Sequence, residues 1–104
     1  MSTEVSVPVS RPEPTREELW LGEYGWERAR AAEVTALYAS HLEHVGRLAD
    51  DGGLLMIGRT AENRAMAVFR DEVTAGQFLT DDPLFVTGTA AAVPVRSWQG
   101  ARYG

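Results

Sequence analysis

The side chains of this chain that could do chemistry are few, and their types already limit the reaction. The 104 residues include two histidines, no cysteine and no lysine, since all 10 basic residues are arginine. Disulfides, thiolate metal sites and cysteine nucleophiles are therefore excluded, as are Schiff bases and the lysine of a P-loop. Two histidines also argue against a zinc or haem site. We expect no metal and no cofactor, so any chemistry must come from His, carboxylate, Arg, Tyr or hydroxyl groups.

His41 is the strongest candidate, because it lies within a run of apolar residues at helical spacing. Val34, Leu37, His41, Val45 and Leu48 fall on one side of a helix with about 3.6 residues per turn. An imidazole on this face could transfer protons near neutral pH. The alternative is a core histidine whose hydrogen bonds are satisfied and which has no catalytic role.

Asp82 could orient His41 and stabilise its protonated form, as a carboxylate does for a histidine in many acid–base sites. A second interpretation is equally open, in which Asp82 only ends a helix before Pro83. Asp81 is expected to be the solvated aspartate of the two. His44 lies one turn from His41 on the shoulder of the apolar stripe, so it is predicted to be a surface residue.

Two further side chains could bind a substrate beside His41. Tyr38, one turn earlier in the same helix, could donate a hydrogen bond to a substrate oxygen, and Arg59 could bind a carboxylate or phenolate through two hydrogen bonds. Packing explains Tyr38 equally well, and Arg59 is at least as well explained as a solvated turn residue. Other aromatic residues could line a pocket or fill the core, namely Trp20, Tyr24, Trp26 and Trp98.

The hydrophobic periodicity predicts the elements that must position these residues. Strands are predicted at residues 18–25, 54–58, 64–70 and 89–98, and helices at residues 27–50 and 72–80. Residues 59–63 are predicted to be a turn, and Asp71 to be the N-cap of the second helix. The order strand, helix, strand, strand, helix, strand indicates an α+β fold. It is the ferredoxin-like βαββαβ pattern, with a four-stranded antiparallel sheet and both helices on one face.

The length of the chain fits one domain, which we expect at residues 17–98. Three prolines within residues 1–16 predict an extended N-terminal arm, although Val5, Val7 and Val9 alternate as in a short edge strand. Residues 99–104 are predicted to be a loose C-terminal tail. A small domain of this kind leaves one face of its sheet open, so we expect a homodimer that covers it.

Charge and hydropathy limit the partners. The net charge of −5 and the isoelectric point near 4.9 argue against nucleic acid and anionic membranes, because phosphate binding needs clustered positive charge. No apolar run reaches the roughly 18 residues of a transmembrane helix, and the N-terminus lacks a signal-peptide pattern. We therefore expect a cytoplasmic protein that acts on a small molecule. The exclusive use of arginine suggests a G+C-rich bacterial genome and, as a setting, specialised metabolism.

The chain resembles the YCII-related (YciI-like) family of small bacterial proteins between residues 18 and 98. The matching motifs are residues 41–45 with Leu48, residues 53–58, residues 67–69, residues 82–85 with Gly88, and the closing strand to Trp98.

The resemblance implies a ferredoxin-like subunit that forms a dimeric α/β barrel. It also implies a catalytic histidine and aspartate, which match His41 and Asp82. The family commonly has Gly-Pro where this chain has Gly58 and Arg59, and the N-terminal arm is longer than usual. The arginine would add a cation near the mouth of the pocket, which suggests an anionic ligand.

Three functions are compatible with these features. The first is a cofactor-free acid–base enzyme of lyase, isomerase or cyclase type, acting on a small cyclic or aromatic oxygenated metabolite. In it, His41 moves the proton, Asp82 holds the imidazole, and Arg59 or Tyr38 steadies oxyanion charge. The second is a non-catalytic dimeric binding or accessory protein with the same pocket. The third is a cofactor-independent monooxygenase.

Overall fold

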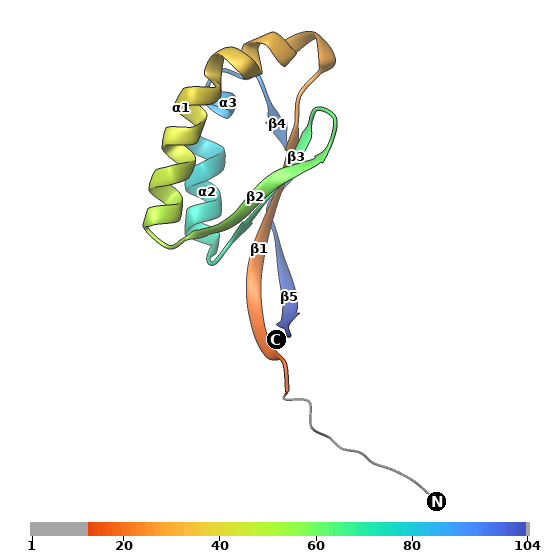
Figure 1. The fold of residues 1–104 in the computed structure, drawn as a ribbon, viewed down its shortest axis with the longest axis vertical. Coiled ribbons are helices and arrows are strands. Elements are labelled where there is room, and N and C mark those ends of the chain that lie inside the picture. The colour runs from red at the N-terminus through yellow and green to blue at the C-terminus, as the bar shows by residue number, and fades with distance from the viewer. Residues whose placement is uncertain (1–12, 104) are drawn as a thin grey trace, which may run out of the picture.

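Five antiparallel strands form one sheet, and α1 and α2 lie side by side against one of its faces (Figure 1). The computed structural model describes residues 13–103. The strands are β1 Thr15–Gly25, β2 Leu54–Ala61, β3 Arg64–Phe69, β4 Ala91–Ala92 and β5 Arg96–Arg102. The helices are the 3-10 turn η2 Arg28–Arg30, followed by α1 Ala31–Asp50, α2 Glu72–Asp81 and α3 Pro83–Val86. The predicted α+β class is confirmed.

β1 is the central strand of the sheet. It pairs with β3 on one side, and with both β4 and β5 on the other, so that the order is β2-β3-β1-β4 with β5 also beside β1. Four strands were predicted, with a single one at residues 89–98. That prediction is wrong, because the region contains two strands and a break between them. Pro94 lies in the break, where a residue without a backbone N–H cannot donate to the ladder.

The two ends of the described chain pair with each other. β1 begins at Thr15, within the predicted arm, and β5 continues to Arg102, where a loose tail was predicted. Thr15 lies opposite Arg102, and the Arg102 Nε donates to the Glu17 carboxylate over 2.7 Å. β3 reaches β1 only as far as Trp20, so residues 15–19 and 98–102 form a two-stranded projection, here called the terminal ribbon. The alternation of Val5, Val7 and Val9 lies outside the described residues.

α1 confirms the predicted first helix from residue 31 onward, while η2 replaces its first turn. The helix ends where Gly52 adopts a positive φ of 85°, a conformation that glycine adopts without steric cost. The following Gly53 is needed for another reason. Its Cα faces the side chain of Thr74 in α2 so closely that an added Cβ would clash with it. The glycine pair therefore ends α1 and lets the chain pass close to α2.

The hairpin between β2 and β3 is tighter than predicted. β2 extends through Arg59 to Ala61, so Arg59 is a strand residue and not part of a turn. The reversal is made at Asn63, whose φ of 63° lies in the left-handed region that asparagine tolerates. This tight turn fixes Arg59 to the sheet, on the strand that lies nearest to α1.

The core lies between the sheet and the helices. Alternate residues of β1 and β3 face α1 and α2, because successive side chains of a strand point to opposite faces. The largest fully buried apolar side chains of this core come from both layers; they are Phe69, Phe78 and Leu84. None of the helices in the described part of the chain lies on the opposite face of the sheet (Figure 1).

Asp71 confirms its predicted role as the N-cap of α2. Its carboxylate accepts hydrogen bonds from the backbone N–H of Thr74 over 2.7 Å and from the Thr74 hydroxyl over 2.9 Å. We expect Asp71→Ala to lower the free energy of unfolding by about 1 kcal/mol, because two donors of the first turn lose their acceptor. Urea denaturation measures the change. Asp81→Ala, at the exposed C-terminal end of the same helix, is the control and should change the stability by less than about 0.5 kcal/mol.

Candidate functional site

The Asp82 carboxylate is the centre of the site. α2 ends at Asp81 and α3 begins at Pro83, so Asp82 is the single residue between the two helices. Its backbone is extended, with φ −67° and ψ 136°, as the following proline favours. Asp82 is fully buried and Asp81 is exposed, as expected. The Asp82 Oδ1 accepts the backbone N–H of Leu84 over 3.0 Å, so that the carboxylate caps α3 while it faces the interior.

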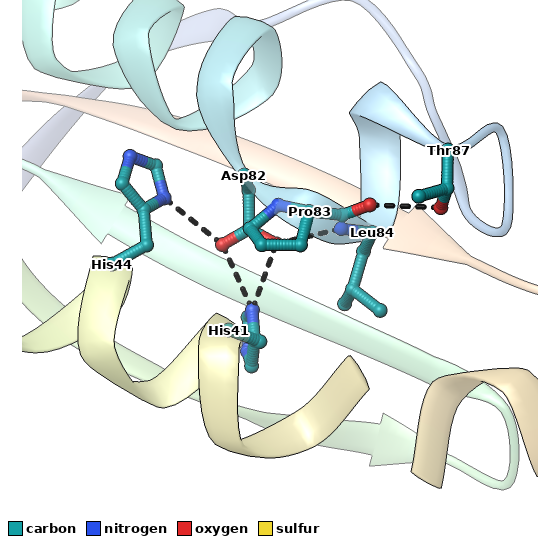
Figure 2. Close-up of polar contacts among 6 residues, drawn as sticks. All are labelled: His41, His44, Asp82, Pro83, Leu84 and Thr87. Carbon is teal, nitrogen blue, oxygen red and sulfur yellow. Dashed lines mark hydrogen bonds and ion pairs between the residues drawn. The ribbon is translucent and has the colours of Figure 1, made fainter. Parts of the chain in front are cut away.

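Two histidines of α1 reach the same carboxylate (Figure 2). The Nδ1 atom of His41 lies 2.9 Å from Oδ2 and 3.0 Å from Oδ1 of Asp82. The Nδ1 atom of His44 lies 3.0 Å from Oδ2. The predicted contact between His41 and Asp82 is therefore present, and the structure adds His44 to it.

The prediction that His44 lies at the surface is wrong, because only 6% of the residue is exposed, as for His41. The fully buried positions of α1 are Val34, His41, His44 and Leu48, and the half-buried Leu37 and Val45 also pack against the core. Spacings of three and four residues keep His41, His44 and Leu48 on one side of a helix. The predicted stripe included Val45, which does pack against the core, but it left out His44, three residues after His41.

Hydrogen bonding decides the protonation of the cluster. Burial alone raises the pKa of the Asp82 carboxyl, but the hydrogen bonds from His41, from the Leu84 backbone N–H and from His44 lower it below its ordinary value. An ionised carboxylate can only accept, so the Nδ1 atom of each histidine must be the donor. A neutral His41 then has an unprotonated Nε2, and no hydrogen-bond partner of that atom occurs among residues 13–103.

His41 also faces a cavity of about 130 Å³ between α1 and the sheet. Tyr38 and Arg59, the two predicted substrate-binding residues, line the same cavity, whereas His44 and Asp82 do not. The ring centroids of Tyr38 and His41 are 6.0 Å apart. The Arg59 Cζ lies 5.7 Å from the centre of the Trp26 ring, a cation–π contact that holds the guanidinium beside the cavity. Three of the four predicted site residues, namely Tyr38, His41 and Arg59, therefore border one cavity. The fourth, Asp82, holds His41 through its Nδ1 atom.

Sequence reasoning assigned no site role to Tyr24, which lines this cavity as well. Tyr24 had been grouped with residues that either line a pocket or fill the core. It is on the helix-facing side of β1, and its ring packs edge-on against Phe78 and Phe85. The alternation of β1 placed Tyr24 and Trp20 on one face, but only the fold shows that the face at Tyr24 borders the cavity.

Comparisons with protein-family models, with curated proteins and with solved structures give no match. Within residues 13–103, no helix has the length and apolar character needed to cross a membrane. The same residues contain no group of three or more His, Cys, Asp or Glu side chains that could hold a metal ion.

The shared carboxylate predicts which ring nitrogen of each histidine carries the proton. We expect neutral His41 and neutral His44 both to carry the proton on Nδ1, because both donate to ionised Asp82. Long-range ¹H–¹⁵N correlation spectra of the imidazole rings distinguish the two tautomers directly. Asp82→Asn should remove the preference at both histidines, since an amide can donate as well as accept. An Nε2–H tautomer of His41 in the unmodified protein would contradict this assignment.

Proposed function

We propose that this protein is a cytoplasmic, cofactor-free acid–base enzyme of lyase, isomerase or cyclase type. Its substrate would be a small cyclic or aromatic oxygenated molecule, in keeping with the size of the cavity. The observation that carries the proposal is the difference between the surroundings of the two ring nitrogens of His41. The Nδ1 atom of His41 is held by Asp82, and its Nε2 atom belongs to a side chain that borders a cavity.

The proposed mechanism is a proton transfer to His41. A substrate C–H or O–H bond breaks, its proton moves to Nε2, and the electron pair remains on the substrate. The imidazolium that forms is stabilised by the ionised Asp82, to which Nδ1–H already donates. The proton then returns to another atom of the substrate in an isomerisation or cyclisation, or protonates a leaving group in an elimination. Arg59 or Tyr38 steadies the substrate oxygen that becomes negative.

One observation favours the second function, a non-catalytic binding protein. Asp82 accepts three hydrogen bonds from two separate elements, so the cluster also joins α1 to α3. A buried histidine of this kind would be kept for the fold alone, and the cavity would only bind a ligand. The two functions differ in what each histidine is needed for, because His41 borders the cavity and His44 does not.

His41→Ala and His44→Ala form a matched pair that separates these functions. Both remove one hydrogen bond to Asp82, but only the first removes a base from the cavity. The probe is nitrobenzisoxazole, which loses one carbon-bound proton to a base as its N–O bond breaks and a coloured nitrophenolate forms. We expect His41→Ala to lower the rate of this elimination about 100-fold or more. His44→Ala should keep most of the rate.

Thermal denaturation of both variants serves as the control, since each should lose similar stability. Equal losses of rate in the two variants would support the binding protein. If the unmodified protein eliminates nitrobenzisoxazole no faster than buffer alone does, the proposed acid–base function is contradicted.

We further propose that the subunit is ferredoxin-like, belongs with the YCII-related proteins and forms a dimeric α/β barrel. Taken as one interrupted strand, β4 and β5 give the ferredoxin-like order, with β1 between them and β3. The hydrogen bond between His41 and Asp82 supports the resemblance, which had matched both residues to the family's catalytic pair.

The uncovered face of the sheet supports the homodimer. It contains a groove of about 720 Å³ that is lined mainly by apolar residues, among them Leu19, Leu21, Met66, Val68 and Trp98, and bordered by the charged Glu17, Arg59 and Arg102. Met56 lies directly opposite Val68 and is 70% exposed. Large apolar patches of this kind are usually covered by another protein surface, and a second sheet would cover this one.

A charge introduced on this face should separate the subunits. We expect Met56→Glu to convert a dimer into a monomer, because two carboxylates would be buried without partners at the interface. Sedimentation velocity measures the change. Val73→Glu is the control, since Val73 is also 70% exposed but lies on α2, away from this face. A monomeric unmodified protein, or equal effects of the two variants, would argue against the barrel.

A further inference from the structure

Tyr24 is a buried phenol at the cavity that contains His41. Only 7% of the residue is exposed, and it borders the cavity together with Arg59 and Tyr38. Its ring is held by edge-on contacts to Phe78 and Phe85, with ring centroids 5.5 Å and 5.3 Å away. The phenol is thus fixed on a strand of the sheet, opposite the helix that carries His41.

The hydroxyl group of Tyr24 has no hydrogen-bond partner among residues 13–103, whose side-chain hydrogen bonds lie elsewhere. Buried tyrosine hydroxyls normally find a partner, because an unpaired buried hydroxyl has lost its water without compensation. Phenylalanine would fill the same space in the core without this cost. A molecule bound in the cavity could therefore supply the missing partner, because its oxygen atom would accept a hydrogen bond from the Tyr24 hydroxyl.

The charges around the phenol keep it a donor. Burial raises the pKa of Tyr24, and the neighbouring Asp82 carboxylate and Tyr38 raise it further, while Arg59 acts in the opposite direction. The hydroxyl consequently keeps its proton at neutral pH. Tyr24 lines the same cavity as His41, Tyr38 and Arg59, so this donor borders the groups of the site.

We propose that Tyr24 is the oxyanion-binding residue of this site, and that the substrates are enolisable carbonyl compounds or phenols. The inference rests on the proposed function. When His41 Nε2 takes a proton from the carbon next to a carbonyl, the C–H electron pair forms a C=C bond. The carbonyl π electrons then move to oxygen. Tyr24 donates a hydrogen bond to this oxygen and keeps its own proton, so the step needs no further reactant.

Arg59 gives the same cavity a second means of holding negative charge. Its guanidinium rests on the Trp26 ring and carries a permanent positive charge at the wall formed by β2. A neutral donor from β1 and a cation from β2 would therefore hold the oxygen, while the base comes from α1. This arrangement favours substrates whose negative charge develops on oxygen during the reaction over substrates that lack such an oxygen.

Tyr24→Phe tests the inference, because it removes one hydroxyl and leaves the ring. The probes are para-nitrophenolate, which carries a negative oxygen, and nitrobenzene, which lacks it. We expect the variant to bind para-nitrophenolate about tenfold more weakly or worse, since a hydrogen bond to a charged group is lost. Nitrobenzene binding should stay within about twofold. Tyr103→Phe, at an exposed tyrosine of the same chain, is the control and should leave both affinities unchanged.

The melting temperature of Tyr24→Phe is a second measurement. If the hydroxyl served only the fold, its removal would lower this temperature. Tyr24→Phe should melt at the same temperature as the unmodified protein or higher, because the hydroxyl has no partner to lose. A lower melting temperature, an unchanged affinity for para-nitrophenolate, or no binding of that probe by the unmodified protein would overturn the inference.

The outcome is separable from that of the proposed function. If elimination of nitrobenzisoxazole depends on His41, the proposed acid–base function is supported even when Tyr24→Phe changes no affinity. Binding of para-nitrophenolate that depends on Tyr24, without any elimination that depends on His41, would identify an oxyanion-binding site in a protein that is no acid–base enzyme.

Discussion

A charged carboxylate buried in the interior is tolerated only if it is surrounded by donors, and this requirement organises the structure. The Asp82 carboxylate has three such donors, two from one side of α1 and one from the first turn of α3. Removing water from an ion costs several kcal/mol unless hydrogen bonds replace it. The helix layer can therefore adopt few other arrangements. Any shift of α1 along its axis would take His41 and His44 away from the one group that accepts their protons.

The same constraint gives His41 and His44 the same hydrogen-bond acceptor, although the two imidazoles differ in what else surrounds them. Two histidines with almost identical contacts to one carboxylate differ in what their other nitrogen meets. His41 belongs to the cavity wall and His44 does not, because they are three residues apart on a helix and so differ in direction. The two imidazoles therefore differ in their surroundings, while the shared aspartate favours the same tautomer for both.

Local patterns predicted α1, α2 and the Asp71 cap, since each depends on residues near in sequence. The contact between His41 and Asp82 joins residues 41 positions apart, and it was suggested by the resemblance to the YCII-related family. The parts that were missed depend on distant residues. β5 has no alternating apolar pattern over residues 99–102 and becomes a strand only because β1 offers it an edge. His44 needed the partner that buries it, and Tyr24 needed the packing of β1 against α1. Tertiary context of this kind is absent from a window of a few residues.

The terminal ribbon has a consequence for the order in which the chain folds. The hydrogen bond between Arg102 and Glu17 joins residues 85 positions apart, and the sheet pairs of the ribbon span similar separations. Closing so long a loop has a larger entropic cost than forming the hairpin of β2 and β3. Within residues 13–103, no third strand pairs with the ribbon to support it. The two ends of the domain should therefore join after the helix layer has formed, and they should be the first part of the sheet to exchange its amide protons with water.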